Sequence, residues 1–185
     1  MFLMAMPQVL DPYFHRSVVL LIHHDEEGSF GFIVNRPTGI RVAEILAGME
    51  IPWCGDPAAI ALFGGPVQPN LGSVLCPKLP DELPEDRFAG TEIAPGITVT
   101  QHVGDLQVLA ASAPEEFRLV LGYAGWGEGQ LLEEILRNDW LTAPADGELI
   151  FATEPEAAWE KALRSVGVEP GALPTWSPGG SGDAN

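Results

Sequence analysis

The sequence contains little that marks a secreted, metal-binding or nucleic-acid-binding protein. Only two cysteines occur among its 185 residues, Cys54 and Cys76, and they form no Cys-x-x-Cys pair. Neither a disulfide framework nor a structural zinc site is therefore indicated. Nine basic residues stand against 26 acidic ones, and the net charge of −17 creates a field that repels phosphate backbones and anionic membranes. We therefore predict no metal, no cofactor, no nucleic-acid partner and no membrane association.

Long hydrophobic runs are also missing. No apolar stretch approaches the roughly 20 residues that a membrane-spanning helix needs. The first six residues are apolar, but they lack a basic segment and reach Pro7 too soon for a signal peptide. With only two cysteines, the chain suits a reducing compartment, and we expect a cytoplasmic protein.

The composition predicts one ordinary domain. Hydrophobic residues make up 46% of the chain and charged residues 19%, which is enough apolar material for a substantial core. We expect the domain to cover residues 1–169. Residues 170–185 are rich in glycine, proline and serine, and we expect them to be loosely ordered.

The apolar pattern predicts more strands than helices. Strands are predicted at residues 17–23, 30–34, 61–63, 73–76, 97–101, 117–121 and 148–151. Helices are predicted at residues 42–49, from Asp105 as a cap, at 131–136 and from Pro155 onward. Residues 77–95, rich in proline and acid, are expected to form an exposed connection. Strands that arrive in hairpins favour an α+β fold over a doubly wound sheet.

Four short blocks resemble the AlgH/YqgE family of bacterial proteins, in the family's order. They are residues 5–18 (AMPQVLDPYFHRSV), 31–37 (GFIVNRP), 64–67 (GGPV) and 122–141, which begins GYAGW and ends WL. The resemblance implies mainly antiparallel sheets that form a flattened pseudo-barrel, with helices packed outside. It implies little about activity, because the family is largely uncharacterised and is named after a proposed transcriptional regulator.

The candidate binding residues come from these blocks. Arg36 presents a planar fork that suits a carboxylate, a phosphate or a partner's backbone, and an internal ion pair is the alternative. Gly64 and Gly65 allow close backbone approach to an anion, and a tight turn is the alternative. The predicted ligand-binding set is Arg16, Asn35, Arg36, Pro37, Gly64, Gly65, Tyr123, Trp126 and Gln130.

Residues 122–129 follow a predicted strand and open a predicted helix, the context of a phosphate-binding loop. Their glycine spacing fits neither common nucleotide motif, no lysine follows, and Glu128 adds negative charge where a phosphate would lie. We therefore interpret the segment as a packing corner, in which small residues allow Tyr123 and Trp126 to pack closely against the sheet or a neighbouring chain.

No assembled catalytic group is visible in the sequence. Ser17 lies outside any G-x-S-x-G elbow, and His23 and His24 point to opposite faces of a strand. The leading hypothesis is a non-catalytic binding or regulatory domain for an unknown protein or a small anionic ligand. The alternative is an enzyme or thiol-based redox sensor that uses Cys76 or a pocket carboxylate. A transcriptional regulator is a third reading, which rests on the family name alone.

Overall fold

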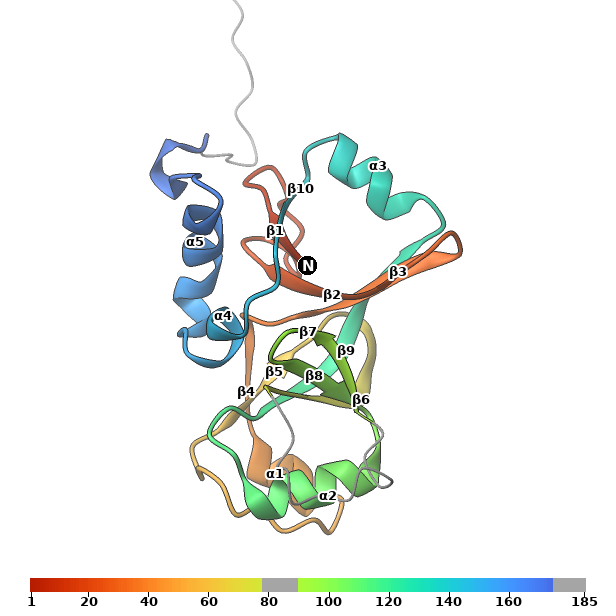
Figure 1. Ribbon diagram of the computed structural model, residues 1–185, viewed down its shortest axis with the longest axis vertical. Helices are drawn as coiled ribbons and strands as arrows, with labels where there is room; N and C mark the ends of the chain where they lie inside the picture. Colours follow the sequence, from red (N-terminus) through yellow and green to blue (C-terminus); the bar gives the residue numbers. More distant parts are fainter. Residues whose placement is uncertain (78–89, 175–185) are drawn as a thin grey trace, which may run out of the picture.

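A ten-stranded, curled sheet forms the frame of the computed structural model, which describes residues 1–77 and 90–174 (Figure 1). Its strands are β1 (Phe2–Ala5), β2 (Val18–His24), β3 (Gly28–Ile33), β4 (Pro37–Arg41), β5 (Ile60–Phe63), β6 (Val67–Cys76), β7 (Thr91–Ala94), β8 (Ile97–Thr100), β9 (Arg118–Gly127) and β10 (Trp140–Ala143). The main path runs β10-β1-β2-β3-β9-β6-β8-β7, while β5 pairs with both β4 and β9. The strand pairs are antiparallel apart from β5 with β9.

The helices cover the curled sheet from outside. They are α1 (Val42–Ala47), α2 (Val103–Ser112), α3 (Gln130–Leu136), α4 (Gly147–Phe151), α5 (Pro155–Ser165) and the 3-10 turn η2 (Pro170–Ala172). In Figure 1, α1 and α2 lie together at one end of the molecule, whereas α4 and α5 lie along one side. Each group closes its own cluster of buried apolar side chains, and α3 closes a third.

Helix α5 illustrates how the sequence pattern creates this packing. Pro155 starts the helix, where its missing N–H costs nothing, and Ala158, Trp159, Ala162 and Leu163 fall on one buried face. The indole N–H of Trp159 donates a 2.8 Å hydrogen bond to a carbonyl oxygen of β1. Helix α5 is thus fixed to the sheet by both apolar burial and a polar anchor.

Strand β9 joins the two halves of the sheet. Gly122 has a φ of +70°, which bends the strand in its middle. On one side of the bend, Leu119 and Val120 pair with β6; on the other, Ala124 and Gly125 pair with β3. The same strand therefore sets the register of both halves.

The connection from β5 to β6 crosses β9 at this bend in direct backbone contact. The N–H of Gly64 donates to the carbonyl of Leu121 (2.7 Å), and the carbonyl of Gly64 accepts from the N–H of Ile33 (2.9 Å). A Cβ atom at Gly64 would lie 2.3 Å from the Gly122 oxygen, and one at Gly65 would lie 2.2 Å from the Tyr123 carbonyl carbon. Only glycine fits at either position, so this segment is a structural crossing.

The α+β fold and the mainly antiparallel, barrel-like sheet are confirmed. The predicted strand at residues 148–151 is wrong: these residues form helix α4, because the Asp146 carboxylate caps it by accepting from the N–H of Glu148. The predicted loop after residue 121 is also wrong, since β9 continues to Gly127 through pairing with β3. Helix α2 begins at Val103, so Asp105 lies in its first turn instead of at its cap.

Strands β1, β4, β7 and β10 were not predicted, because four or five residues carry little periodic signal. Strand β7 falls within the expected connection at residues 77–95, of which residues 78–89 lie outside the described part. In the predicted tail, η2 packs against α5 and Leu173 packs against the adjacent core, while residues 175–185 lie outside the described part. The predicted domain boundary at residue 169 stays a prediction.

The crossing predicts that Gly65→Ala strongly destabilises the protein. Its added Cβ would meet the backbone of β9, which cannot move without breaking strand pairs, so we expect a loss of more than about 2 kcal/mol in the free energy of unfolding. Urea denaturation measures this loss. Gly171→Ala is the matched control, since its Cβ would meet no atom within 4 Å. Equal midpoints for the two variants would contradict a structural crossing.

Candidate functional site

The Asn35 side chain ties the end of β3 to the residues that precede β2. Its Oδ1 accepts from the N–H of Val18 (2.8 Å), and its Nδ2 donates to the carbonyl of Arg16 (3.0 Å). Arg16 has a φ of +54°, and its guanidinium carbon lies 5.2 Å from the centre of the Trp159 ring. Asn35 and Arg16 thus fix how the chain enters the sheet.

Arg36 uses its guanidinium fork within the protein. Its two terminal nitrogens donate to the carbonyls of Pro12 (2.9 Å) and His15 (2.8 Å). The partners are main-chain carbonyls instead of the acidic side chain considered as the alternative. The Arg36 carbonyl accepts from the N–H of Phe63 (2.7 Å), and Pro37 then opens β4. Arg36 therefore connects the loop at residues 12–15 to both β4 and β5.

A single carboxylate organises the corner between β9, α3 and β10, which contains two tryptophans. Glu134 accepts from the indole N–H groups of Trp126 (2.9 Å) and Trp140 (2.7 Å) and from the side-chain amide of Gln130 (2.9 Å). The ring of Phe14 meets the Trp140 ring edge-on at 5.8 Å. Gln130 thus has its amide bound inside this corner, and the interpretation as a packing corner accounts for these contacts.

Two of the predicted binding residues, Tyr123 and Trp126, line a hollow of about 430 Å³ beside the β2–β3 hairpin. Arg16, Arg36 and Gly65 are not among the residues that line it. The predicted set is therefore divided between this hollow, a separate cavity lined in part by Pro37, and the contacts that hold the chain together.

Polar groups of the hairpin form much of the hollow's surface. His23 Nε2 and Asp25 Oδ2 lie 2.6 Å apart, and this hydrogen bond is the main cause of a lowered pKa at Asp25. Nδ1 of His24 lies 2.6 Å from Oγ of Ser29. Asp25 and Glu27 give the hollow negative charge, which does not favour an anionic ligand.

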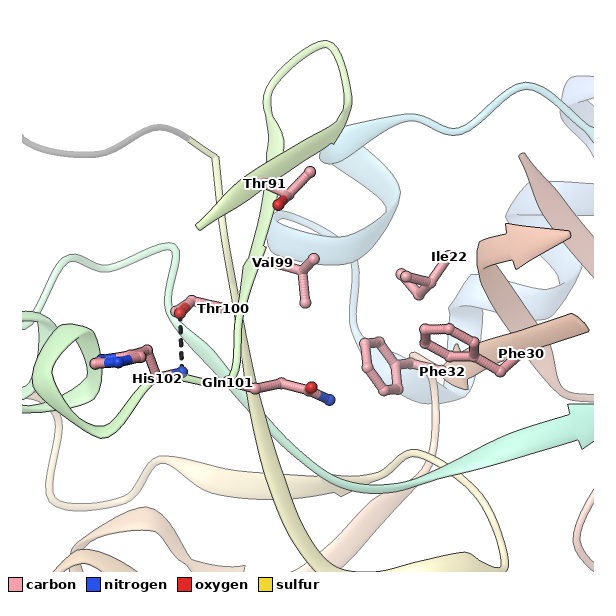
Figure 2. A pocket seen from close by; sticks show the side chains of 8 residues that line it. All are labelled: Ile22, Phe30, Phe32, Thr91, Val99, Thr100, Gln101 and His102. Carbon is pink, nitrogen blue, oxygen red and sulfur yellow. Dashed lines mark hydrogen bonds between the residues drawn. The ribbon is translucent and has the colours of Figure 1, made fainter. Parts of the chain in front are cut away.

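Figure 2 shows a second concave region, which shares the half-buried side chain of Phe30 with the hollow. This region has a volume of about 360 Å³, and we call it the hairpin groove. Its lining residues are Ile22, Phe30, Phe32, Thr91, Val99, Thr100, Gln101 and His102. It is mostly apolar, with polar groups along one rim.

The two walls of the hairpin groove come from opposite halves of the sheet. Ile22 belongs to β2, and Phe30 and Phe32 belong to β3, whereas Thr91 and Val99 belong to β7 and β8. In Figure 2 the two phenyl rings and Ile22 lie across an open space from Val99. Phe30 also meets the Tyr123 ring edge-on at 5.8 Å, which links the groove to the hollow.

Hydrogen bonds fix the polar rim of the groove. Thr100 Oγ1 donates to the buried carboxylate of Asp105 (2.6 Å) and accepts from the N–H of His102 (3.1 Å). The amide of Gln101 donates to Oγ of Ser73 (2.9 Å). The rim is therefore held in place before any ligand arrives.

Sequence reasoning did not single out the groove residues. Phe30 and Phe32 are two positions apart and so share one face of β3, which is the one local signal available. A β-bulge between Leu21 and His23 shifts the register of β2. The alternation of residues along the sequence therefore does not show on which face of the strand Ile22 lies. The opposite wall arrives from about 60 to 80 residues further along the chain, which no local pattern reports.

The two cysteines differ in environment. Cys76 is buried, and desolvation, followed by the nearby charge of Asp105, raises the pKa of its thiol to about 11. Cys54 is exposed.

Within residues 1–77 and 90–174, no three His, Cys, Asp or Glu side chains gather as metal ligands would. No helix in the described part of the chain has the length and apolar character needed to span a membrane.

These features define a curled α+β domain whose concave surfaces are lined mainly by apolar and hydrogen-bonding side chains. Comparison with known proteins gives its family: residues 2–171 match the model of the AlgH-like family, and the chain belongs to it.

Relatives of similar length support this assignment. The chain is 38% identical to a UPF0301 protein of Shewanella oneidensis, with 94% of both chains covered. It is also 38% identical to a UPF0301 protein of Xanthomonas oryzae pv. oryzae, covering 90% of this chain and 88% of that one.

Two solved structures have the same fold. The solution structure of AlgH from Pseudomonas aeruginosa superposes with a TM-score of 0.74 at 35% identity, over 91% of this chain and 88% of that one. A crystal structure of a protein from Corynebacterium diphtheriae gives a TM-score of 0.73 at 24% identity, over 89% and 84% of the two chains, and supports the fold alone.

The contacts of Arg36 predict that Arg36→Ala lowers the free energy of unfolding by roughly 1–3 kcal/mol, because two carbonyls lose a charged donor. Thermal and urea denaturation measure this change. Arg41→Ala is the control: Arg41 pairs with Glu44 at an exposed surface, and we expect a loss below about 1 kcal/mol. Arg36→Ala with unchanged stability and weakened ligand binding would instead assign Arg36 to a binding surface.

The cysteine environments predict that one thiol of the native protein reacts with Ellman's reagent near neutral pH. Cys54 is exposed, whereas Cys76 is buried and its raised pKa keeps it protonated. The second thiol should appear only after denaturation, and Cys54→Ser should abolish the native reaction. Rapid labelling of Cys76 in the folded Cys54→Ser variant would support the thiol-sensor hypothesis instead.

Proposed function

We propose that this protein is a non-catalytic binding domain and that its ligand occupies the hairpin groove and the adjoining hollow. The observation that carries the proposal is the half-buried Phe30 ring, which lines both regions and connects an apolar space to a polar one. Ligand sites commonly combine apolar walls with a few fixed polar groups in about 300–1,000 Å³. The groove and the hollow each fall within that range.

The hydrogen bonds of the hairpin favour binding over catalysis. Among the described residues, Ser29 and His24 pair a hydroxyl with an imidazole at 2.6 Å. The nearby carboxylate of Asp25 bonds to His23, so it does not orient His24 as a triad would require. Cys76, the residue of the thiol alternative, is buried with a raised pKa and is poorly suited to act as a nucleophile.

The charges around the site favour a neutral or cationic group over the anion considered from sequence. Asp25 and Glu27 line the hollow, and the donors of Arg36 are bound to carbonyls elsewhere. We propose that the ligand is a segment of a partner protein that places an apolar side chain in the groove, with Tyr123 and Trp126 at its border.

The free cysteines and the charge of −17 support a cytoplasmic location for this interaction.

Indole is a suitable probe for the groove, because it is a neutral apolar ring of side-chain size. In a titration followed by NMR, we expect chemical-shift changes centred on Ile22, Phe30 and Val99. Thr91→Trp should weaken indole binding about tenfold or more, since a bulky side chain on this exposed edge position fills the groove.

Glu92→Trp is the matched control. It adds the same side chain on the same edge strand, but adjacent residues of a strand face opposite sides. We expect it to leave indole binding unchanged. Equal affinity of Thr91→Trp and the wild type, or shifts confined to other surfaces, would sink the proposal.

A further inference from the structure

A separate cavity of about 580 Å³ lies where β4, β5 and β9 meet the α4–α5 connection, and it shares no lining residue with the hairpin groove or the hollow. Four separate segments of the chain contribute to its wall. Its described lining includes three aromatic rings and four carboxylates, and we call it the acidic cavity.

The aromatic part of the wall is rigid. The rings of Trp53 and Phe117 lie 4.9 Å apart between their centres, inclined by 46°. The Trp53 indole N–H donates to the carbonyl of Asp56 (2.9 Å), which fixes the ring's orientation. The third ring, Phe151, is buried at the end of α4. Such rings present faces that attract cations.

The carboxylates of the cavity are exposed, and one oxygen of Asp56 accepts from the N–H of Ala58 (2.8 Å). They belong to Asp56, Glu115, Glu154 and Glu156. The ion pairs formed among the described residues use other carboxylates. The four carboxylates therefore form no ion pair among the described residues and give the lining an excess of negative charge.

One guanidinium, that of Arg118, also lies in the wall, but its hydrogen bonds are directed into the protein. It donates to the carbonyls of Phe117 (3.0 Å) and Phe151, and its carbon lies 5.8 Å from the Phe151 ring centre. Burial lowers the pKa of Arg118, and the charges of Glu116 and Glu154 act against this effect. Four carboxylates with one guanidinium leave three negative charges in excess.

We propose that the acidic cavity binds the alkylammonium group of a lysine side chain from a partner protein. The half-buried Trp53 ring contacts the alkyl chain and presents its face to the cation, and the carboxylates accept its N–H bonds. Charge complementarity identifies this occupant: three excess negative charges disfavour an anion, and the aromatic Trp53 ring beside the carboxylates favours an organic cation with an alkyl chain over a hydrated metal ion. The site is independent of the one proposed for the hairpin groove.

The test is an NMR titration of the full chain with matched probes. Pentylammonium, neutral pentanol and pentanoate share one alkyl chain and differ in charge. We expect pentylammonium to shift the signals of Trp53 and Phe117 and to bind at least tenfold tighter than the other two. An acetylated, amidated Gly-Lys-Gly peptide should bind at least as tightly as pentylammonium, which distinguishes a lysine of a protein from a free amine.

Two variants assign the binding to its groups. Glu115→Gln with Glu156→Gln should weaken pentylammonium binding about tenfold, and Trp53→Leu, which keeps an apolar side chain, should weaken it about two- to fivefold. Glu128→Gln with Glu133→Gln is the control, since it removes the same charge from exposed positions outside the cavity. Thermal denaturation checks that each variant is folded.

Several outcomes would overturn the proposal. Equal binding of pentanol and pentylammonium would make the cavity a purely apolar site. An equal loss in the control pair would assign the effect to the overall field of the protein. Calcium ions that displace pentylammonium and shift the same signals would make it an inorganic cation site, and a peptide that binds more weakly than pentylammonium would make it a site for free amines.

Discussion

The backbone crossing of Gly64 and Gly65 over Gly122 is the constraint on which the rest of the structure depends. It brings three strands, β3, β5 and β9, within hydrogen-bonding distance at one point, where a single added methyl group would meet backbone atoms at 2.2–2.3 Å. Because backbone cannot rotate away as a side chain can, the crossing fixes the angle between the two halves of the sheet. The curl of the sheet and the surfaces against which its helices pack follow from that angle.

The residues that carry the family resemblance mostly maintain this frame. Asn35 and Arg36 hold the segment before β2 through carbonyl and N–H contacts, and the half-buried Glu134 binds two indoles and an amide in one corner. These polar groups are half-buried, and the loss of one partner leaves the other without its hydrogen bond, so each contact depends on its particular partner. A motif can therefore be highly specific for a fold while leaving the ligand undetermined, as it does here.

The strands at residues 17–23 and 30–34 could be predicted because each is a long apolar or β-branched run that ends in polar turns. The helix at residues 148–151 could not be predicted, since four residues are too few to show a helical or strand period. The hydrogen bond from the N–H of Glu148 to the Asp146 side chain favours the helix there. Tyr123 and Trp126 were identified as possible binding residues and do line a hollow. Phe30 and Val99 were not, because their meeting depends on how two halves of a sheet curl together.

The walls of the hairpin groove belong to different halves of the sheet, and this has a thermodynamic consequence. The ligand proposed for the groove would contact both halves at once, so its binding would require the crossing to hold them at the native angle. Binding and the integrity of the crossing are therefore linked, and a ligand that binds only the native arrangement stabilises it. The acidic cavity also depends on this frame, because β4, β5 and β9 supply one of its walls while α4 and α5 supply another. The glycines that define the fold thus set the geometry of both proposed sites without lining either of them.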